Sequence, residues 1–339
     1  MVVKYQDFSY PTLQLSSALY AVAKLGIAEK LGFDLECKKK VSDIAKDLGA
    51  NADYLFRTMH FLAVNGCFIE VPNEEGVFKH NDISLALVDP SIRAETLLIN
   101  GVCHYRSFET LDETILTGKC QSGKALNSKD VWDFYAKNPD KEVDFARAMT
   151  AKTKRLAPIL ATLGDYSDFD TVCDIGGSQG ILISEILSKN PNVKKGINFD
   201  LAAVLGNIKS EDRVHPVDHR YSECPGDFFV RVPAADCYIL KMILHDWDDN
   251  KSKEILNTIG KSMNNNGRVH IIELIRDNQN PIDEKYLASM DLYMLQLFGA
   301  KERSLKQWEE LLKDTPFVID HVKNSAIPHG PNIIVLRKK

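Results

Sequence analysis

The spacing of apolar residues changes along this chain of 339 residues. In the first 90 or so residues, apolar positions recur at helical intervals and then shorten into two extended pieces. The predicted helices are 1–31, 41–49 and 52–65, and the extended pieces 67–71 and 77–79 flank a turn at 73–76. Ser42 stands where a cap for the 41–49 helix is expected.

From Phe169 onward, short apolar runs alternate with amphipathic stretches. This alternation predicts an α/β fold with a mostly parallel sheet and helices on both faces. The expected strands are 171–175, 195–199, 214–217, 236–244, 268–274, 318–325 and 332–336. The expected helices are 180–189, 201–210, 251–263, 286–298 and 305–315, and Asn264–Asn266 are expected in a turn before Gly267.

The middle of the chain, residues 91–165, is helical and irregular and gathers large apolar side chains. They are Trp132, Phe134, Tyr135, Phe145 and Met149. Such side chains either form core or line a pocket for a flat apolar ligand.

Bulk composition excludes several classes of partner. The formal net charge of −5 gives no general attraction to nucleic acids or anionic membranes. No run of about 18 apolar residues is present to span a membrane, and the start does not resemble a signal peptide. The seven cysteines are scattered without metal-ligand spacing, which is typical of reduced thiols in a cytoplasmic protein.

The predicted order of elements, helix–turn–helix followed by a two-stranded wing, is that of a winged-helix module. Such a module either binds DNA or serves as a helical packing or dimerisation unit. The second helix carries only Arg57 and His60 as basic residues. Acidic side chains surround them: Asp43, Asp47, Asp53, Glu70, Glu74 and Glu75. DNA recognition needs side chains that neutralise phosphates, so packing or dimerisation is favoured over DNA binding.

The apolar run 237–244 ends abruptly in His245, which is followed by Asp246, Trp247, Asp248 and Asp249. A titratable imidazole at the carboxyl end of a buried strand sits where α/β sheets place their chemistry. The alternative is that His245 merely precedes a helix whose start the aspartates cap. Three carboxylates at a helix start diverge, so a magnesium site is disfavoured.

A glycine-rich turn, DIGGSQG, follows the strand 171–175. Its glycines at 176, 177 and 180 do not fit the dinucleotide spacing, which argues against a nicotinamide dehydrogenase. Asp174 would repel a pyrophosphate but attract a sulfonium or ammonium group. Twenty residues beyond Gly180, Asp200 ends the next strand, where an acid can bind ribose hydroxyls. Asp227 with Phe228 suits an adenine ring, or Asp227 is a turn residue.

These motifs form an ordered series: DIGGSQG, NFDL, PGDFF, LKMILHDWDD, HIIEL and FGAKERSLKQWEELL. The chain therefore resembles the plant-type, metal-independent small-molecule O-methyltransferases, which include caffeate and acetylserotonin methyltransferases and use S-adenosyl-L-methionine. The resemblance covers nearly the whole chain. It implies the class I methyltransferase fold, with a Rossmann-like, mostly parallel seven-stranded sheet. It also implies a winged-helix-like dimerisation domain (1–95), a helical connector that contributes to the acceptor pocket (96–165) and a catalytic domain (166–339).

By this resemblance, His245 is the general base, with Glu273 and Glu302 as the acids that orient it. The implied cofactor site comprises Asp174, Gly176, Asp200, Asp227, Phe228 and Lys241. The implied acceptor pocket comprises Phe145, Met149, Met242, Asp246, Met290 and Tyr293. No metal is expected. The expected substrate is a small hydroxylated aromatic molecule, and the expected assembly is a homodimer through apolar faces of 10–25 and 97–116, which could instead be buried core.

Three positions depart from the family pattern. Ser178 replaces a usual loop glycine, and because serine is small we expect cofactor binding to survive. Lys152 stands where plant members often carry a histidine, and Met242 replaces a frequent tryptophan. These two changes affect the identity of the acceptor. A ligand-sensing regulator, or a relative with altered chemistry, is the alternative, but His245, Glu273 and Glu302 together argue against lost catalysis.

Overall fold

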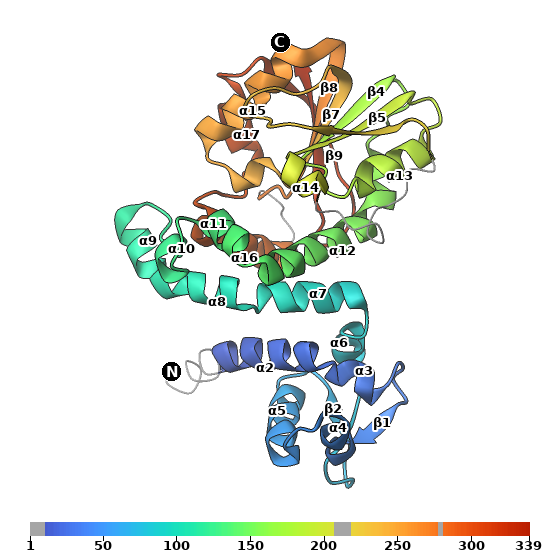
Figure 1. Cartoon of the computed structure of the whole chain (residues 1–339), viewed down its shortest axis with the longest axis vertical. Coiled ribbons are helices and arrows are strands. Elements are labelled where there is room, and N and C mark those ends of the chain that lie inside the picture. The colour runs from blue at the N-terminus through green and yellow to red at the C-terminus, as the bar shows by residue number, and fades with distance from the viewer. Residues whose placement is uncertain (1–10, 207–217, 277–280) are drawn as a thin grey trace. The chain divides into compact units, whose positions relative to one another are not determined.

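The computed structural model describes residues 11–206, 218–276 and 281–339 (Figure 1). These residues form two compact units. The first unit contains the described residues up to Phe108 together with Trp132–Lys152, and the second contains Glu109–Val131 and Thr153–Lys339. The strand expected at 214–217 and the end of the helix expected at 201–210 lie outside the described residues.

The first unit is mainly helical. Its elements are α2 (Pro11–Leu25), α3 (Ile27–Leu31), β1 (Lys38–Lys40), α4 (Val41–Leu48), α5 (Ala52–Val64), β2 (Ile69–Glu70), β3 (Val77–Lys79), α6 (Asp82–Ala86), α7 (Pro90–Ile99) and α8 (Val102–Ser107), with α11 (Val131–Lys137) and the start of α12 (Pro139–Leu163) following later in the chain. The apolar faces of α4 and α5 bury Ile44, Met59 and Leu62 against Phe78 of β3. The two helices and the hairpin thus share one core, as their apolar spacing predicted.

Two local details differ from expectation. Ser42 does not cap α4, because Lys40 is the residue that precedes the helix and its side chain makes no capping bond. The reason is that Lys38–Lys40 form a strand, which was not predicted, and Lys40 is still paired with Val77 of β3. A run of three lysines has no apolar alternation, so only its pairing with β3 makes it a strand.

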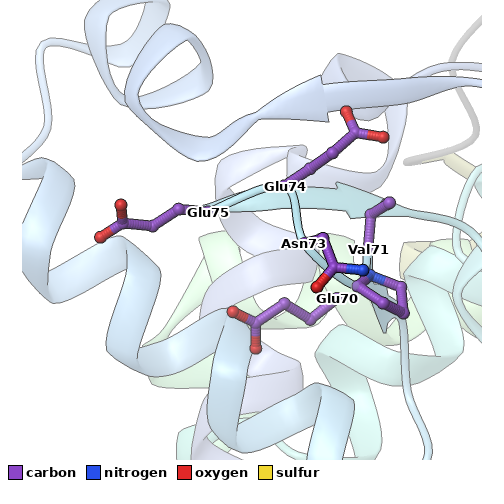
Figure 2. Close-up of a pocket in the computed structure, with 6 residues that line it drawn as sticks. Glu70, Val71, Asn73, Glu74 and Glu75 are labelled. Carbon is purple, nitrogen blue, oxygen red and sulfur yellow. The ribbon is translucent and has the colours of Figure 1, made fainter.

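The hairpin turn between β2 and β3 is acidic. Figure 2 shows the carboxylates of Glu70, Glu74 and Glu75 directed away from one another around this turn. Glu74 pairs with Lys38 at 2.6 Å and Glu70 with His60 at 2.7 Å. His60, one of the two basic residues of α5, thus faces a carboxylate, which leaves this surface poorly suited to DNA phosphates.

The second unit is built on a sheet with seven strands among its described residues, in the order β6-β5-β4-β7-β8-β10-β9. The strands are β4 (Thr171–Ile175), β5 (Lys195–Asp200), β6 (Tyr221–Pro225), β7 (Ala235–Lys241), β8 (Met263–Glu273), β9 (Phe317–Lys323) and β10 (Asn332–Lys338). The first five in spatial order run parallel, and β10 is antiparallel to both β8 and β9. The carboxyl ends of β4, β5, β7 and β8 therefore lie along one edge.

Helices cover both faces of this sheet (Figure 1). The helix α13 (Ile181–Lys189) and the end of α12 pack on one face, and α15 (Asp249–Ser262) and α17 (Leu305–Leu312) pack on the other. The other helical elements of the unit are α14 (Ala202–Gly206), α16 (Pro281–Phe298), α9 (Leu111–Thr117), α10 (Ser122–Ala125) and a short 3-10 segment at Phe108–Thr110. Successive residues of β7 point to opposite faces of the sheet. Cys237 and Ile239 pack with α13 on one face, whereas Tyr238 and Leu240 pack with α15 and α17 on the other. Burial on both faces explains why β7 is a continuous apolar run.

Two expectations in this unit need correction. The strand β6 was not predicted, because it has no apolar run: Ser222 and Glu223 are polar, and none of its residues is fully buried. Asn264–Asn266 were expected in a turn, but they belong to β8. The pairing of β8 with β7 jumps from Met263 to Arg268 at this point, and Asn266 has φ 64°. The three asparagines thus form a bulge rather than a chain reversal.

Among the described residues, every helix is too short or too polar to cross a bilayer.

Candidate active site

The chain turns sharply after β7 to present His245. Met242 has φ 54°, a left-handed conformation that is strained for a residue with a side chain. A turn of 3-10 helix, Leu244–Asp246, follows, and Asp248 then caps α15 by accepting a hydrogen bond from the Lys251 N–H at 2.9 Å. The helix-start interpretation therefore holds for Asp248, whereas His245 lies before the helix and is buried.

Glu302 and Glu273 both contact His245, although they are distant in sequence. His245 Nδ1 lies 2.9 Å from Glu302 Oε1, and the main-chain N–H of His245 donates to Glu273 Oε1 at 3.1 Å. Both glutamates are completely buried. Glu302 thus holds the imidazole ring, while Glu273 holds the backbone from which that ring projects.

The other ring nitrogen faces Asp246. His245 Nε2 lies 3.5 Å from Asp246 Oδ1, which is longer than a good hydrogen bond. With Nδ1 directed at a carboxylate, the neutral ring carries its proton on Nδ1 and its lone pair on Nε2. The geometry therefore leaves Nε2 as the position that can accept a proton.

Three carboxylates surround the His245 imidazole and perturb its pKa. Burial lowers the pKa of His245, but the Asp246 and Glu302 carboxylates outweigh it and raise the pKa to about 9. Burial raises the pKa of Asp246 to about 6 and that of Glu273 to about 7. The carboxylates around His245 therefore favour the charged form of its ring.

The glycine loop follows β4 at the same edge of the sheet. Gly176 and Gly180 have φ 70° and 72°, and Ser178 has φ 50°. Ser178 is held at both ends of its backbone: its N–H donates to Asp200 Oδ2 at 2.9 Å, and its carbonyl accepts from Asn198 Nδ2 at 2.7 Å. Two side chains of β5 thus hold the loop in place.

Space beside the loop is too small for side chains. A Cβ on Gly177 would lie 2.3 Å from Asn198 Oδ1 and 2.8 Å from Asp174 Oδ2, and one on Gly176 would lie 2.5 Å from Ile243 Cδ1. Glycine is therefore required at both positions, which brings the backbone close to neighbouring groups.

The loop fits a cationic nucleoside such as S-adenosyl-L-methionine. Asp174 is buried at the end of β4; burial raises its pKa to about 7, Lys241 opposes this effect and Asp200 adds to it. Burial likewise raises the pKa of Asp200. A cation near these carboxylates would favour their charged forms. Two buried acceptors, Asn198 Oδ1 and Gln179 Oε1, have no hydrogen-bond partner among the described residues, which suits a ligand with hydroxyl or amino donors.

Asp227 and Phe228 follow β6. The Asp227 side chain accepts a hydrogen bond from the Phe229 N–H at 2.8 Å, so Asp227 does stabilise a turn. The Phe228 ring packs edge-on against Phe229 and Trp247, with ring centroids 4.9 and 6.1 Å apart. Trp247 follows the His245 turn, so this aromatic group connects PGDFF with LKMILHDWDD.

The predicted acceptor-pocket residues lie in both units. In the second unit, α16 carries Met290 and Tyr293 and contacts the 3-10 turn that contains His245. Both side chains are half-buried, and burial raises the pKa of Tyr293. In the first unit, Phe145 and Met149 lie one turn apart on α12, and the Phe145 ring lies 4.9 Å from that of Tyr135.

Two residues at this edge were not singled out from the sequence. Asn198, in NFDL, holds the Ser178 carbonyl. Arg303, directly after Glu302, is completely buried and contacts the His245 turn. The signal for Asn198 was a polar residue between the apolar residues Ile197 and Phe199. For Arg303 it was an arginine inside the KER motif, where long cations are normally exposed.

Comparisons with known proteins agree with this class I methyltransferase architecture. An O-methyltransferase domain model matches residues 108–318. O-methyltransferase 9 of Dictyostelium discoideum is 34% identical over 314 residues, which cover 90% of this chain and 86% of that protein. Phenazine O-methyltransferase PhzM of Lysobacter antibioticus is 32% identical over 317 residues, covering 92% and 90%.

Solved structures are similar over the full length. The crystal structure of LaPhzM has a TM-score of 0.86 and 30% identity, covering 100% of this chain and 99% of that one. The mitomycin 7-O-methyltransferase MmcR has a TM-score of 0.88 and 25% identity, covering 100% and 98%. The fold and site define a class I methyltransferase. The chain belongs to the plant-type O-methyltransferase family, and its methyl donor is S-adenosyl-L-methionine.

Proposed function

We propose that this O-methyltransferase methylates a hydroxyl group of a small aromatic molecule, with His245 as the general base. The names of two relatives support the substrate class, since one acts on a phenazine and the other on a mitomycin. The single observation that carries the proposed mechanism is the buried contact of 2.9 Å between His245 Nδ1 and Glu302.

The proposed donor site consists of Asp174, Gly176, Asp200, Asp227, Phe228 and Lys241. S-adenosyl-L-methionine supplies an activated methyl group on a sulfonium, with a neutral thioether as the leaving group. Gly176 lets the backbone approach the donor, and Asp200 has a carboxylate at the end of β5 for ribose hydroxyls. Burial of the Asp174 carboxylate strengthens its attraction for a cation.

His245 would take the proton of the acceptor hydroxyl on Nε2. Glu302 fixes the ring and stabilises the imidazolium that forms, as a carboxylate does in triad-type sites. A pKa raised to about 9 makes His245 a stronger base, but it reduces the neutral fraction at pH 7. Activity that depends on the neutral ring should therefore increase as pH rises toward 9.

The residues proposed to bind the acceptor are Met242, Asp246, Met290 and Tyr293 of the second unit, with Phe145 and Met149 of the first unit added by the family resemblance. Thioether side chains adapt to flat aromatic ligands of different outline, and Phe145 adds a rigid apolar surface. The strained backbone of Met242, immediately before the His245 turn, supports a role at the ligand. With methionine in place of a bulkier side chain, we expect room for a fused-ring phenol.

The His245→Gln variant tests this mechanism. We expect it to fold, to keep its affinity for S-adenosylhomocysteine and to lose at least about 100-fold in methyl transfer, because general bases contribute about 10²–10⁴-fold. Acceptors come from a screen of phenols, catechols and hydroxyindoles with isotope-labelled donor, read by mass spectrometry. His321→Gln, the same change at an exposed histidine of β9, is the matched control. Near-wild-type turnover of His245→Gln would exclude the general-base role.

We also propose that residues 1–95 form a winged-helix-like dimerisation domain, that 96–165 connect it to the catalytic domain at 166–339, and that the protein is a cytoplasmic homodimer. Exposed apolar side chains support this assembly, including Leu13 and Leu25 on α2 and Leu116 on α9. Light scattering of the purified chain should give twice the monomer mass of 38.1 kDa. A concentration-independent monomer would contradict the proposal.

A further inference from the structure

We propose that Arg303 is a positioning residue that holds the His245 turn in its active conformation; this inference rests on the proposed role of His245 as general base. Arg303 touches neither nitrogen of the imidazole in the hydrogen bonds of the described residues. It acts on the backbone that carries the ring.

The Arg303 guanidinium binds the turn on both sides of His245. Its Nη1 donates to the Leu244 carbonyl at 2.9 Å, and its Nη2 donates to the Trp247 carbonyl at 2.9 Å. Nη2 also lies 3.2 Å from Ser252 Oγ on α15. One rigid planar group thus fixes the carbonyls that precede and follow the residues His245 and Asp246.

Asp249 neutralises this buried cation. Arg303 Nε and Nη2 both donate to Asp249 Oδ1, at 3.0 and 2.9 Å, while Lys301 Nζ donates to Asp249 Oδ2 at 2.8 Å. The guanidinium also lies 5.1 Å from the centre of the buried Trp308 ring. A fully buried charge needs such a complete set of partners, so Arg303 has little freedom to move.

The same three-residue segment supplies the carboxylate that contacts His245. Lys301 and Arg303 bind Asp249, and Glu302, between them, contacts His245 Nδ1. A bridge between Ile275 and Arg303 anchors this segment just beyond the end of β8. The distance between His245 and Glu302 is therefore set by the backbones of two segments, and Arg303 binds the backbone of the segment that carries His245.

Loss of Arg303 should affect the chemical step more than donor binding. The carbonyls of Leu244 and Trp247 would lose their shortest hydrogen bonds. They would keep only the Ser252 hydroxyl at 3.3 and 3.4 Å and, for Leu244, the Trp247 N–H at 3.2 Å, so the turn would relax away from Glu302. A misplacement of about 1 Å at a catalytic group can lower a rate about 100-fold. The glycine loop is held separately by Asn198 and Asp200, so it should be unaffected.

The experiment compares Arg303→Met with the wild-type protein, each with and without His245→Gln. We expect Arg303→Met to lower kcat about 10- to 100-fold with the Kd for S-adenosylhomocysteine changed by less than about 3-fold. In the His245→Gln background the additional loss should shrink to less than about 3-fold, because residues that act as a unit are not additive. Arg220→Met is the matched control, because Arg220 also binds main-chain carbonyls, those of Leu187 and Val193, and an aspartate, Asp218, but no residue of the His245 turn.

Because Arg303 is buried, Asp249→Asn provides a variant at a half-exposed position that should fold. It keeps an acceptor but removes the charge, and we expect kcat to fall about 3- to 10-fold, again only when His245 is present. Two results would overturn the positioning role and leave the general-base proposal intact. One is an unchanged kcat in Asp249→Asn. The other is that Arg303→Met or Asp249→Asn lowers kcat by the same factor in the His245→Gln background as in the wild-type protein. Near-wild-type turnover of His245→Gln alone would overturn the general-base proposal itself.

Discussion

Substitution of Glu302 by glutamine removes one negative charge from the group that faces His245 while keeping the side-chain shape. In the native protein Glu302 Oε1 lies 2.9 Å from His245 Nδ1, and the carboxylate is completely buried. Removing the anion favours the neutral imidazole, because Glu302 is one of the groups that raise the pKa of His245. The pKa of His245 should therefore decrease in Glu302→Gln.

The size of the kinetic effect follows from the loss of a hydrogen bond to a charged group. Such bonds contribute about 1.5–3 kcal/mol, and this free energy corresponds to about a 10- to 150-fold decrease in rate. The full decrease should be seen above pH 9, where both proteins hold a neutral ring. At lower pH the loss should be smaller, because the variant has the larger neutral fraction.

The assay is the pH dependence of kcat/KM from pH 6 to pH 10 on an acceptor found by the screen, since kcat/KM reports ionisations of the free enzyme. In the wild-type protein, activity should rise with pH through a value near 9. In Glu302→Gln this rise in kcat/KM, the acid limb of the pH profile, should occur at lower pH. NMR of histidine labelled with ¹⁵N, with His245→Gln to assign the signal, gives the pKa directly.

Glu254→Gln is the control for this change, because Glu254 lies on the neighbouring helix α15 and pairs with Lys251 in solvent. Its pH profile should match that of the wild-type protein. An acid limb at the same pH in Glu302→Gln as in the wild-type protein would refute the electrostatic coupling between Glu302 and His245. A loss smaller than about 3-fold above pH 9 would refute the orienting role.

Three further outcomes are expected. Gly177→Ala should weaken S-adenosylhomocysteine binding in calorimetry by about 10-fold or more, because overpacking costs about 1–3 kcal/mol; Gly206→Ala, where a Cβ meets no atom within 4 Å, should bind normally. Ser178→Gly should raise the free energy of unfolding by up to about 1 kcal/mol through relief of the left-handed backbone, and a loss of donor affinity would instead reveal a ligand contact of the hydroxyl. Treatment with EDTA should leave turnover unchanged, and activity restored by magnesium would contradict this expectation.

Much of the fold could be predicted from local pattern. Strands buried on both faces, such as β4 and β7, are continuous apolar runs, and the helices between them keep a strong apolar periodicity. The elements that were missed are stabilised by their neighbours. The lysines of β1 and the polar residues of β6 become strands because they pair with β3 and β5, and such pairing is not visible in local composition.

The candidate site shows the same division. Its chemistry was readable in the sequence because each motif ends a predicted strand: DIGGSQG after β4, NFDL at β5 and LKMILHDWDD after β7. Parallel strands bring their carboxyl ends to one edge, so the residues could be expected to converge. The connection from Glu302 to His245 came from the family resemblance, since 57 residues separate the two in the chain.

The sequence by itself therefore determined the class of protein and predicted the donor loop and the candidate base. Only the tertiary structure decided the pKa of His245 and the contacts that hold it in position. Burial lowers the pKa of His245, but the carboxylates of Asp246, Glu302 and Glu273 outweigh it and raise the pKa, and Arg303 ties the turn to the Glu302 segment. Protonation depends on the electric field of every nearby charge, and positioning depends on contacts between distant segments. Both are properties of the folded chain, which no local pattern encodes.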